Sequence, residues 1–251
     1  MTATPPVLEM DGHLATLTLS RPEQGNRLSD GDLDVLVEHF ATINASSARV
    51  VRLCALGRHF CAGYDVSDLA SGAGGERFEA TMDALAALRP ITVAEVQGGA
   101  YGGASDLLLA CDFRLGSHAA RVSMPAARFG LHLYGGILRR YVSRLGLNTA
   151  KRMILNTEPL EAQEMFQLGL LTHPPCAAEE LAARSQAIID HLMALAPLAL
   201  EGMKRHLNAI ADGCFETRWL HEDIDRCKAS RDFREGLQAI KDKRPAVFDG
   251  C

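Results

Sequence analysis

Two glycine-rich segments each follow directly after a short apolar run, and this pairing constrains the fold more than any other feature of the sequence. The first, GRHFCAGYD (57–65), comes after VVRLCAL (50–56), and the second, GGAYGG (98–103), comes after ITVAEV (91–96). Short apolar runs bounded by glycine are typical of buried strands. If the two strands are parallel, both glycine loops lie at the same edge of one sheet.

Helical periodicity between these strands supports a parallel α/β arrangement. Residues 28–43 carry apolar side chains at helical spacing, with Ser29 or Asp30 available as the N-cap, and the spacing returns over 78–88. An alternating stretch, LATLTL (14–19), precedes them and predicts a strand. The order strand, helix, strand, helix, strand indicates crossover units with ligand loops at the carboxyl ends of the strands.

The second half of the chain is mostly helical in pattern, after an apolar helix over 104–110 and a strand over 112–115. A composition shift at Ala196 and Pro197 predicts the boundary between an α/β core, residues 1–196, and a helical region, residues 197–251. Strand signals are nearly absent beyond it. The helices predicted in this half cover 160–168, 179–195, 197–211 and 214–230.

Charge, cysteine count and hydropathy argue against several classes of partner. The 26 Lys and Arg residues are spread along the chain and the net charge is −5, so we expect no nucleic-acid partner. No window reaches the ~18 apolar residues of a membrane span, and the first residues do not resemble a leader, which predicts a cytoplasmic protein. Seven scattered cysteines without a CxxC pair favour neither disulfides nor structural zinc.

A basic cluster in the second half of the chain predicts a solvated helix face, and contact with an anionic ligand is the alternative. The cluster consists of Arg139, Arg140, Arg144, Lys151 and Arg152.

The two glycine loops together predict an oxyanion hole. Small residues let the backbone turn tightly and expose N–H groups, and the second loop leads into a helix whose first N–H groups have no helical partner. Two such loops can aim two backbone donors at one oxygen. Ordinary strand-to-helix turns are the alternative for either loop. Neither a GxGxxG nor a GxxxxGK[ST] pattern is present, and a further glycine run, 72–75, predicts a loop over the pocket.

The loop segments resemble the paired signature segments of the crotonase, or enoyl-CoA hydratase/isomerase, superfamily. These segments are GRHFCAGYDV (57–66) and VQGGAYGGASDLLLACDFRL (96–115). Three further segments are similar to family patterns in the same order: RPEQGNRLS (21–29), LEAQEMFQLGLL (160–171) and KDKRPAVF (241–248). The resemblance covers nearly the whole chain, which is identified as a member of this superfamily.

The resemblance implies a ββα-spiral core, a C-terminal helical trimerisation region, and homotrimers or dimers of trimers. It implies an acyl-coenzyme A ligand with no separate cofactor and no metal. The thioester oxygen would lie between the backbone N–H groups of Tyr64 and Gly103, where one preorganised donor stabilises an enolate by ~3 kcal/mol. The residues that would line the path of the coenzyme are Asn26, Arg27, Leu28, Ala62, Asp65 and Val66.

The sequence departs from the hydratase pattern at the residues that would handle water. Family hydratases use two glutamates, and the corresponding positions here hold Asp106 and Ala126. Because alanine cannot transfer a proton, efficient hydration is not expected. Asp106 is a candidate acid or base, or simply a helix N-terminal residue that complements the dipole. His132 and Tyr134 lie in a segment that approaches the acyl group in this family, with core packing as the alternative.

These observations predict an acyl-CoA protein that catalyses an enolate reaction: isomerisation, decarboxylation or weak hydration. Residues 123–134 have some similarity to the same segment of methylmalonyl-CoA decarboxylases, which keeps decarboxylation open. A non-catalytic acyl-CoA carrier of the same fold is the alternative. Hydrolysis of a carbon–carbon bond in a diketone is a third hypothesis, and it requires a His and a carboxylate near Gly103.

Overall fold

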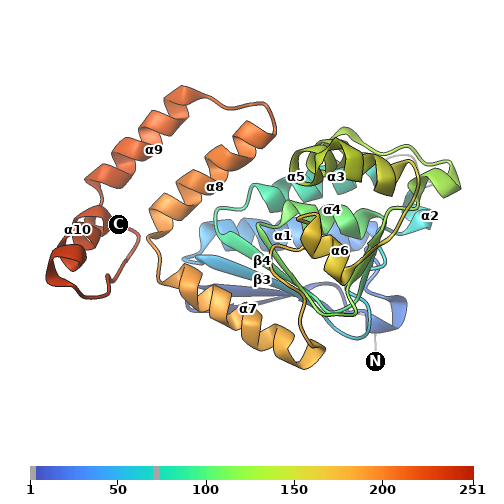
Figure 1. Cartoon of the computed structure of the whole chain (residues 1–251), viewed down its shortest axis with the longest axis horizontal. Coiled ribbons are helices and arrows are strands. Elements are labelled where there is room, and N and C mark those ends of the chain that lie inside the picture. Colours follow the sequence, from blue (N-terminus) through green and yellow to red (C-terminus); the bar gives the residue numbers. More distant parts are fainter. Residues whose placement is uncertain (1–3, 70–73) are drawn as a thin grey trace.

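The computed structural model describes residues 4–69 and 74–251 of the chain. Two sheets are packed against helices, and residues 197–251 form an arm of helices, the C-terminal arm, that leads away from them (Figure 1). The predicted α/β class with a helical C-terminal region is confirmed. Of the glycine run predicted as a loop over the pocket, Gly72 lies outside the described residues, whereas Gly74 and Gly75 already belong to a helix.

The larger sheet has five strands in the order β1-β2-β3-β4-β6. Its first pair is antiparallel and the other pairs are parallel. The carboxyl ends of β3 and β4 therefore lie at one edge, as the sequence predicts. The strands are β1 (Val7–Asp11), β2 (Leu14–Leu19), β3 (Val50–Ala55), β4 (Ile91–Val96) and β6 (Phe113–Gly116).

A smaller three-stranded sheet starts where β4 ends and brings the two glycine loops together. It has the order β5-β7-β8, and β5 is itself part of the second glycine loop. An isolated bridge between Cys61 and Ala100 joins the first loop to β5. Its strands are β5 (Gly99–Tyr101), β7 (Arg121–Ser123) and β8 (Leu160–Glu161).

Helices cover both faces of the larger sheet. On one face, α1 and α3 pack against alternate strand residues such as Leu17 and Leu53, and α4 and α5 continue this layer (Figure 1). On the other face, α7 packs against Val50 and Val93. The helices are α1 (Asp30–Ala45), α2 (Val66–Leu69), α3 (Gly74–Ala86), α4 (Gly103–Ala110), α5 (Gly135–Ile154), α6 (Ala162–Gln167) and α7 (Ala178–Met193), with 3-10 turns η1 (Pro22–Gln24) and η2 (Ala126–Phe129).

The start of α1 forms as its sequence predicts. Ser29 is the N-cap, and its side chain and that of Asp32 exchange hydrogen bonds with each other's backbone N–H in a capping box. This cap fixes the backbone directly after residues 26–28, a turn that lies beside the first glycine loop.

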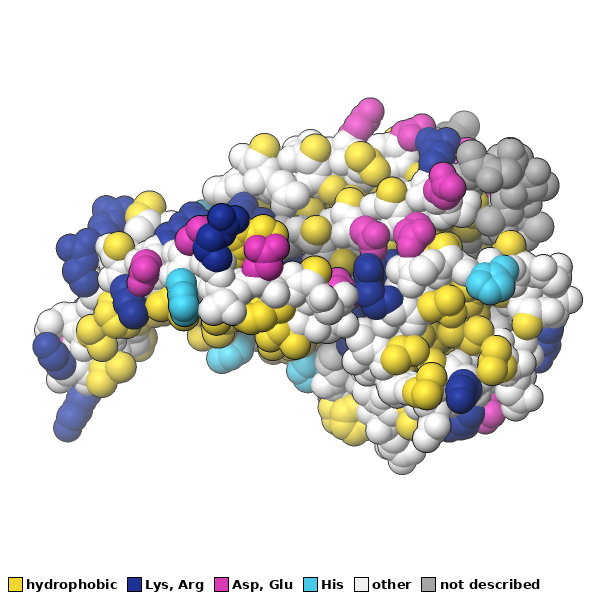
Figure 2. All heavy atoms as spheres, turned by 90° about the horizontal axis from the view of Figure 1, so that it is seen from above, with side chains coloured by type: hydrophobic (Ala, Val, Ile, Leu, Met, Phe, Trp, Pro, Cys, Tyr) yellow, Lys and Arg dark blue, Asp and Glu magenta, His cyan; other side chains and the backbone are white. Residues whose placement is uncertain are grey.

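The C-terminal arm consists of α8 (Pro197–Ala211), α9 (Thr217–Ala229) and α10 (Arg231–Asp242). The arm begins at Pro197, the residue at which the sequence predicts a boundary, and the division into two domains stays a prediction. Hydrophobic side chains lie exposed along the arm (Figure 2), among them Leu207, Ile210 and Ile240. Within residues 4–69 and 74–251, no helix is long and apolar enough to cross a membrane.

Candidate active site

The first glycine loop is held between two other segments by backbone hydrogen bonds. On one side, the Leu28 N–H donates to the Gly63 oxygen at 2.9 Å and the Asp65 N–H donates to the Leu28 oxygen at 2.8 Å. On the other side, the Tyr101 N–H of β5 donates to the Cys61 oxygen at 3.0 Å. The loop therefore joins the 26–28 turn to the second glycine loop.

Gly63 permits this close approach. Its φ of +94° lies in a region that L side chains rarely adopt. A Cβ at this position would lie 2.5 Å from the Tyr101 oxygen and 3.3 Å from the Gly103 nitrogen. The absence of a side chain thus brings the two loops together beside the first amide of α4.

The peptide N–H groups of Tyr64 and Gly103 point away from the backbone segments to which the preceding carbonyl groups are hydrogen-bonded. In a trans peptide the N–H points opposite to the preceding carbonyl. The Gly63 carbonyl is bound by Leu28, so the Tyr64 N–H points away from that turn. The Gly102 carbonyl accepts from the N–H and hydroxyl of Ser105, so the Gly103 N–H points out of the N-terminal end of α4. No acceptor for either N–H is found among the described residues.

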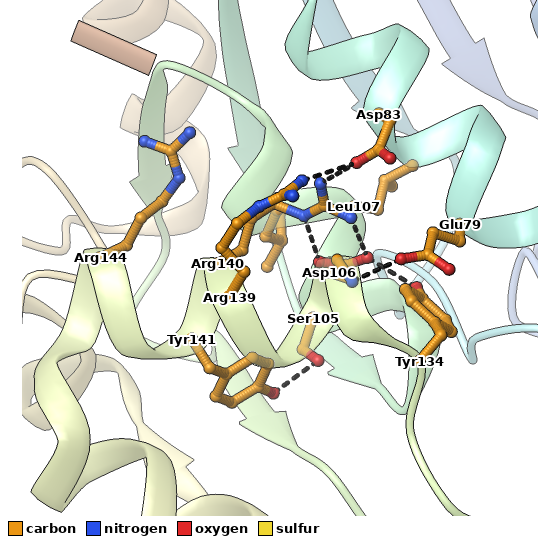
Figure 3. Close-up of polar contacts among 12 residues, drawn as sticks. Glu79, Asp83, Ser105, Asp106, Leu107, Tyr134, Arg139, Arg140, Tyr141 and Arg144 are labelled. Atoms are coloured by element: carbon orange, nitrogen blue, oxygen red, sulfur yellow. Dashed lines mark hydrogen bonds and ion pairs between the residues drawn. The ribbon is translucent and has the colours of Figure 1, made fainter. Parts of the chain in front are cut away.

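Asp106 lies one turn into α4 as a fully buried, ion-paired carboxylate (Figure 3). Arg140 donates from Nε to Oδ1 at 2.6 Å and from Nη2 to Oδ2 at 2.7 Å, and the Tyr134 hydroxyl donates to Oδ2 at 2.6 Å. Arg140 also donates to Asp83 at 2.5 Å. Both oxygens of the carboxylate are therefore occupied by donors.

The electrostatics keep these donors protonated. Burial and the neighbouring Asp106 charge raise the pKa of the Tyr134 phenol above its usual value. Burial alone would lower the pKa of Arg140, but its hydrogen bonds and charge interactions with Asp106 and Asp83 raise it overall. The arrangement is a neutral phenol and a guanidinium that share one carboxylate.

The prediction that the basic cluster forms a solvated helix face is wrong for Arg140. The residue is only 2% exposed, because the helix α5 turns it toward Asp106. The adjacent Arg139 is exposed and pairs with Asp83 and Asp212. Arg140 pairs with a residue 34 positions away, so the spacing of charged residues along its own helix could not predict the contact.

The structure brings some of the other predicted residues to the loops. Asn26 is buried, and its side-chain amide donates to the Leu56 and His59 carbonyls at 2.8 and 2.9 Å, which fixes the start of the first loop. Arg27 and Asp65 form an ion pair at 2.9 Å that joins the 26–28 turn to the end of the first loop. The position next to Asp65, Val66, begins α2.

The remaining predicted residues differ in exposure. Ala62 is exposed in the first loop, and Leu28 is buried in the core. His132 is exposed and its ring nitrogen is bound to the Leu133 carbonyl, so, unlike Tyr134, it is not held at Asp106. Ala126 is buried in η2.

Hydrogen bonds to Ser67, together with the charge of Arg27, lower the pKa of Asp65 below its usual value. The carboxylate is therefore charged and pairs with Arg27 at neutral pH.

Comparison with known proteins identifies the family. A family model described as enoyl-CoA hydratase/isomerase matches residues 9–250. The chain belongs to the enoyl-CoA hydratase/isomerase family. It is 32% identical over 239 residues to the Mycobacterium tuberculosis protein named "Probable enoyl-CoA hydratase echA6", with 94% of this chain and 96% of that protein covered. It is 26% identical over 265 residues to a crotonyl-CoA hydratase of Syntrophomonas wolfei, with 96% of each covered.

Solved structures of this enoyl-CoA hydratase/isomerase family have the same fold over the whole chain. The enoyl-CoA hydratase of Bacillus anthracis superposes with a TM-score of 0.90 at 26% identity, covering 99% of this chain and 100% of that one. A family protein of Hyphomonas neptunium gives a TM-score of 0.92 at 24% identity, covering 99% and 98%. The predicted crotonase fold with C-terminal helices is therefore confirmed.

Proposed function

We propose that this protein binds an acyl-CoA thioester with the thioester oxygen between the Tyr64 and Gly103 N–H groups. The observation that carries the proposal is a pair of amides, at the point where the two glycine loops meet, that have no acceptor within residues 4–69 and 74–251. The Gly103 amide also lies at the positive end of the α4 dipole. Donors fixed in this way stabilise the negative charge that an enolate places on the oxygen.

The coenzyme portion would run along the 26–28 turn and the first loop. The Arg27 and Asp65 pair lies beside this path, and the methyl side chain of the exposed Ala62 is too small to obstruct it. The family membership supports a coenzyme A thioester as the ligand.

Among enolate reactions, decarboxylation fits the side chains best. The bond between the α-carbon and a carboxylate breaks, carbon dioxide leaves, and the electron pair moves onto the thioester oxygen, after which the enolate takes a proton from water. This step depends on the two amides and needs no base. Hydration and isomerisation need a group that transfers a proton. Asp106 has both oxygens bound and Ala126 has no proton to transfer, so hydration would be weak.

The same occupied carboxylate favours a second candidate, a non-catalytic acyl-CoA carrier. Such a protein would keep the amides for affinity and would lack turnover. Diketone hydrolysis is less favoured: His132 is exposed and bound to its neighbour's carbonyl, and the described histidine that is paired with a carboxylate, His206 with Asp223, lies in the C-terminal arm and not near Gly103. For either candidate we propose self-association through the C-terminal arm into homotrimers or dimers of trimers.

Titration calorimetry with butyryl-CoA and free CoA tests the site. We expect the acyl thioester to bind more tightly than CoA, and Gly63→Ala to weaken acyl-CoA binding at least tenfold by pushing the loops apart. Gly12→Ala is the matched control, since Gly12 also has a positive φ, at +56°, but has no neighbour within 4 Å of an added Cβ. Equal weakening by both variants would contradict the proposed site.

Turnover assays separate the two candidates. Carbon dioxide release from a malonyl-type CoA thioester supports the enzyme, and tight binding without turnover of any thioester supports the carrier. Hydration of crotonyl-CoA faster than roughly 10 per second would contradict the claim that the site lacks a water-activating pair.

A further inference from the structure

Three aromatic side chains form a continuous surface beside the two amides, which we name the aromatic wall: Tyr64, Phe78 and Tyr134. The Phe78 ring lies in the middle, with its centroid 5.2 Å from that of Tyr64 and 6.3 Å from that of Tyr134. Phe78 comes from α3 and is 2% exposed. It begins the helical pattern predicted over 78–88, and nothing in that pattern indicates a role in the site.

The tip of the Phe78 ring closes the space next to Gly103. A Cβ on Gly103 would lie 2.8 Å from the Phe78 Cζ and 3.0 Å from its Cε1. These distances are shorter than van der Waals contact, so the ring leaves no room for an added group on this side of Gly103.

The two flanking rings are anchored at their hydroxyl groups. The Tyr64 hydroxyl donates to Asp30, whose other oxygen accepts from Arg77 at 2.8 Å. The Tyr134 hydroxyl donates to Asp106, which is paired with Arg140 (Figure 3). Moving either ring would remove a donor from a carboxylate, and the loss of such a charge-assisted hydrogen bond is costly. The flanking rings therefore restrict the movement of Phe78 between them.

We propose that Phe78 is a specificity-determining residue that restricts the ligand to short acyl groups. This inference rests on the proposed function. If the thioester oxygen lies at the two amides and the coenzyme runs along residues 26–28 and 62–66, the acyl group extends from the amides toward the aromatic wall, where the Phe78 ring against Gly103 ends its path. A butyryl group stops at the wall, whereas an octanoyl group has to displace Phe78.

Calorimetric titration with acetyl-, butyryl-, hexanoyl- and octanoyl-CoA tests the inference. We expect the unaltered protein to bind octanoyl-CoA at least tenfold more weakly than butyryl-CoA. In Phe78→Ala, octanoyl-CoA should bind at least tenfold more tightly than it does to the unaltered protein, because each methylene that gains an apolar site contributes substantially to affinity. Phe40→Ala, which removes a buried ring from α1 outside the wall, should keep the original chain-length profile.

The outcomes distinguish this inference from the proposed function. If acyl-CoA binds no more tightly than CoA, the proposed function is wrong. If acyl-CoA binds but octanoyl-CoA binds the unaltered protein as tightly as butyryl-CoA, or Phe78→Ala keeps the original profile, the inference on Phe78 is wrong. If Phe78→Ala does not fold, Phe78→Leu should still shift the preference toward hexanoyl-CoA, and an unshifted profile overturns the inference.

Discussion

At the scale of single residues, the buried pair of Arg140 and Asp106 carries the largest expected energetic effect. Arg140→Met leaves a fully buried carboxylate without its guanidinium. Removing one partner of a buried pair costs about 3–5 kcal/mol of unfolding free energy. We expect a loss of this size in urea denaturation at pH 7. Arg139→Met is the matched control, because Arg139 is exposed and its ion pairs contribute at most ~1 kcal/mol.

A double variant separates the two causes of the loss. Arg140→Met combined with Asp106→Asn removes the charge that Arg140→Met leaves unpaired. We expect the double variant to lose less unfolding free energy than Arg140→Met alone. An equal loss would mean that the lost packing of the arginine, and not the unpaired charge, causes the destabilisation.

The sequence predicts the backbone of the site better than its side chains. The two glycine loops could be located because glycine spacing after a strand is a local property of the chain, and the resemblance to the family pointed to Tyr64 and Gly103 within them. The pairing of Asp106 with Arg140 and Tyr134 joins residues about thirty positions apart, and no local periodicity encodes it. The same reason hides Phe78, whose contact with Gly103 exists only after α3 packs on α4.

At the scale of elements, the sequence predicts those strands and helices that bury a face. In β2 every second side chain is buried, and β4 is buried on both faces, so their patterns are clear. The pattern does not predict the edge strand β1, because four of its five side chains are exposed and it pairs only with β2. The helix α10 is also absent from the predicted elements, although Phe233, Leu237 and Ile240 have helical spacing after the N-cap Ser230.

The docking of α8 on the core depends on a buried lysine. The Lys204 ammonium, 7% exposed as a residue, lies 2.7 Å from an Asp112 oxygen and 2.7 Å from the Pro90 carbonyl oxygen. Lys204→Met removes both contacts, while Asp112 keeps its donors from Thr92.

We expect the Lys204→Met variant to lose about 1–3 kcal/mol of unfolding free energy, with hydrogen exchange accelerated mainly in α8. Arg205→Met, on the exposed side of the same helix, is the control and should leave the exchange of α8 unchanged. Acceleration confined to the sheet instead of α8 would contradict the docking role.

At the scale of the whole molecule, the C-terminal arm exposes many large apolar side chains, which is unusual for the surface of a monomer. Exposed fractions reach 67% at Leu207, 59% at Ile210 and 76% at Ile240, and hydrophobic side chains follow the arm in Figure 2. Extended apolar patches of this kind mark protein interfaces. In Figure 1, α9 and α10 lie away from the sheets while α8 borders the core. The exposed fractions of these side chains leave them accessible to another copy of the chain.

We therefore expect sedimentation to give a molecular mass three or six times the 27.1 kDa of one chain. Leu207→Glu combined with Ile240→Glu places two charges on the proposed interface, where burying them unpaired is costly, and should shift the species to the monomer. Val37→Glu on α1, also at an exposed apolar position, should leave the assembly intact. Sedimentation velocity measures all three proteins. A monomeric unaltered protein, or a double variant that keeps its assembly, would show that the apolar face of the arm does not hold the subunits together.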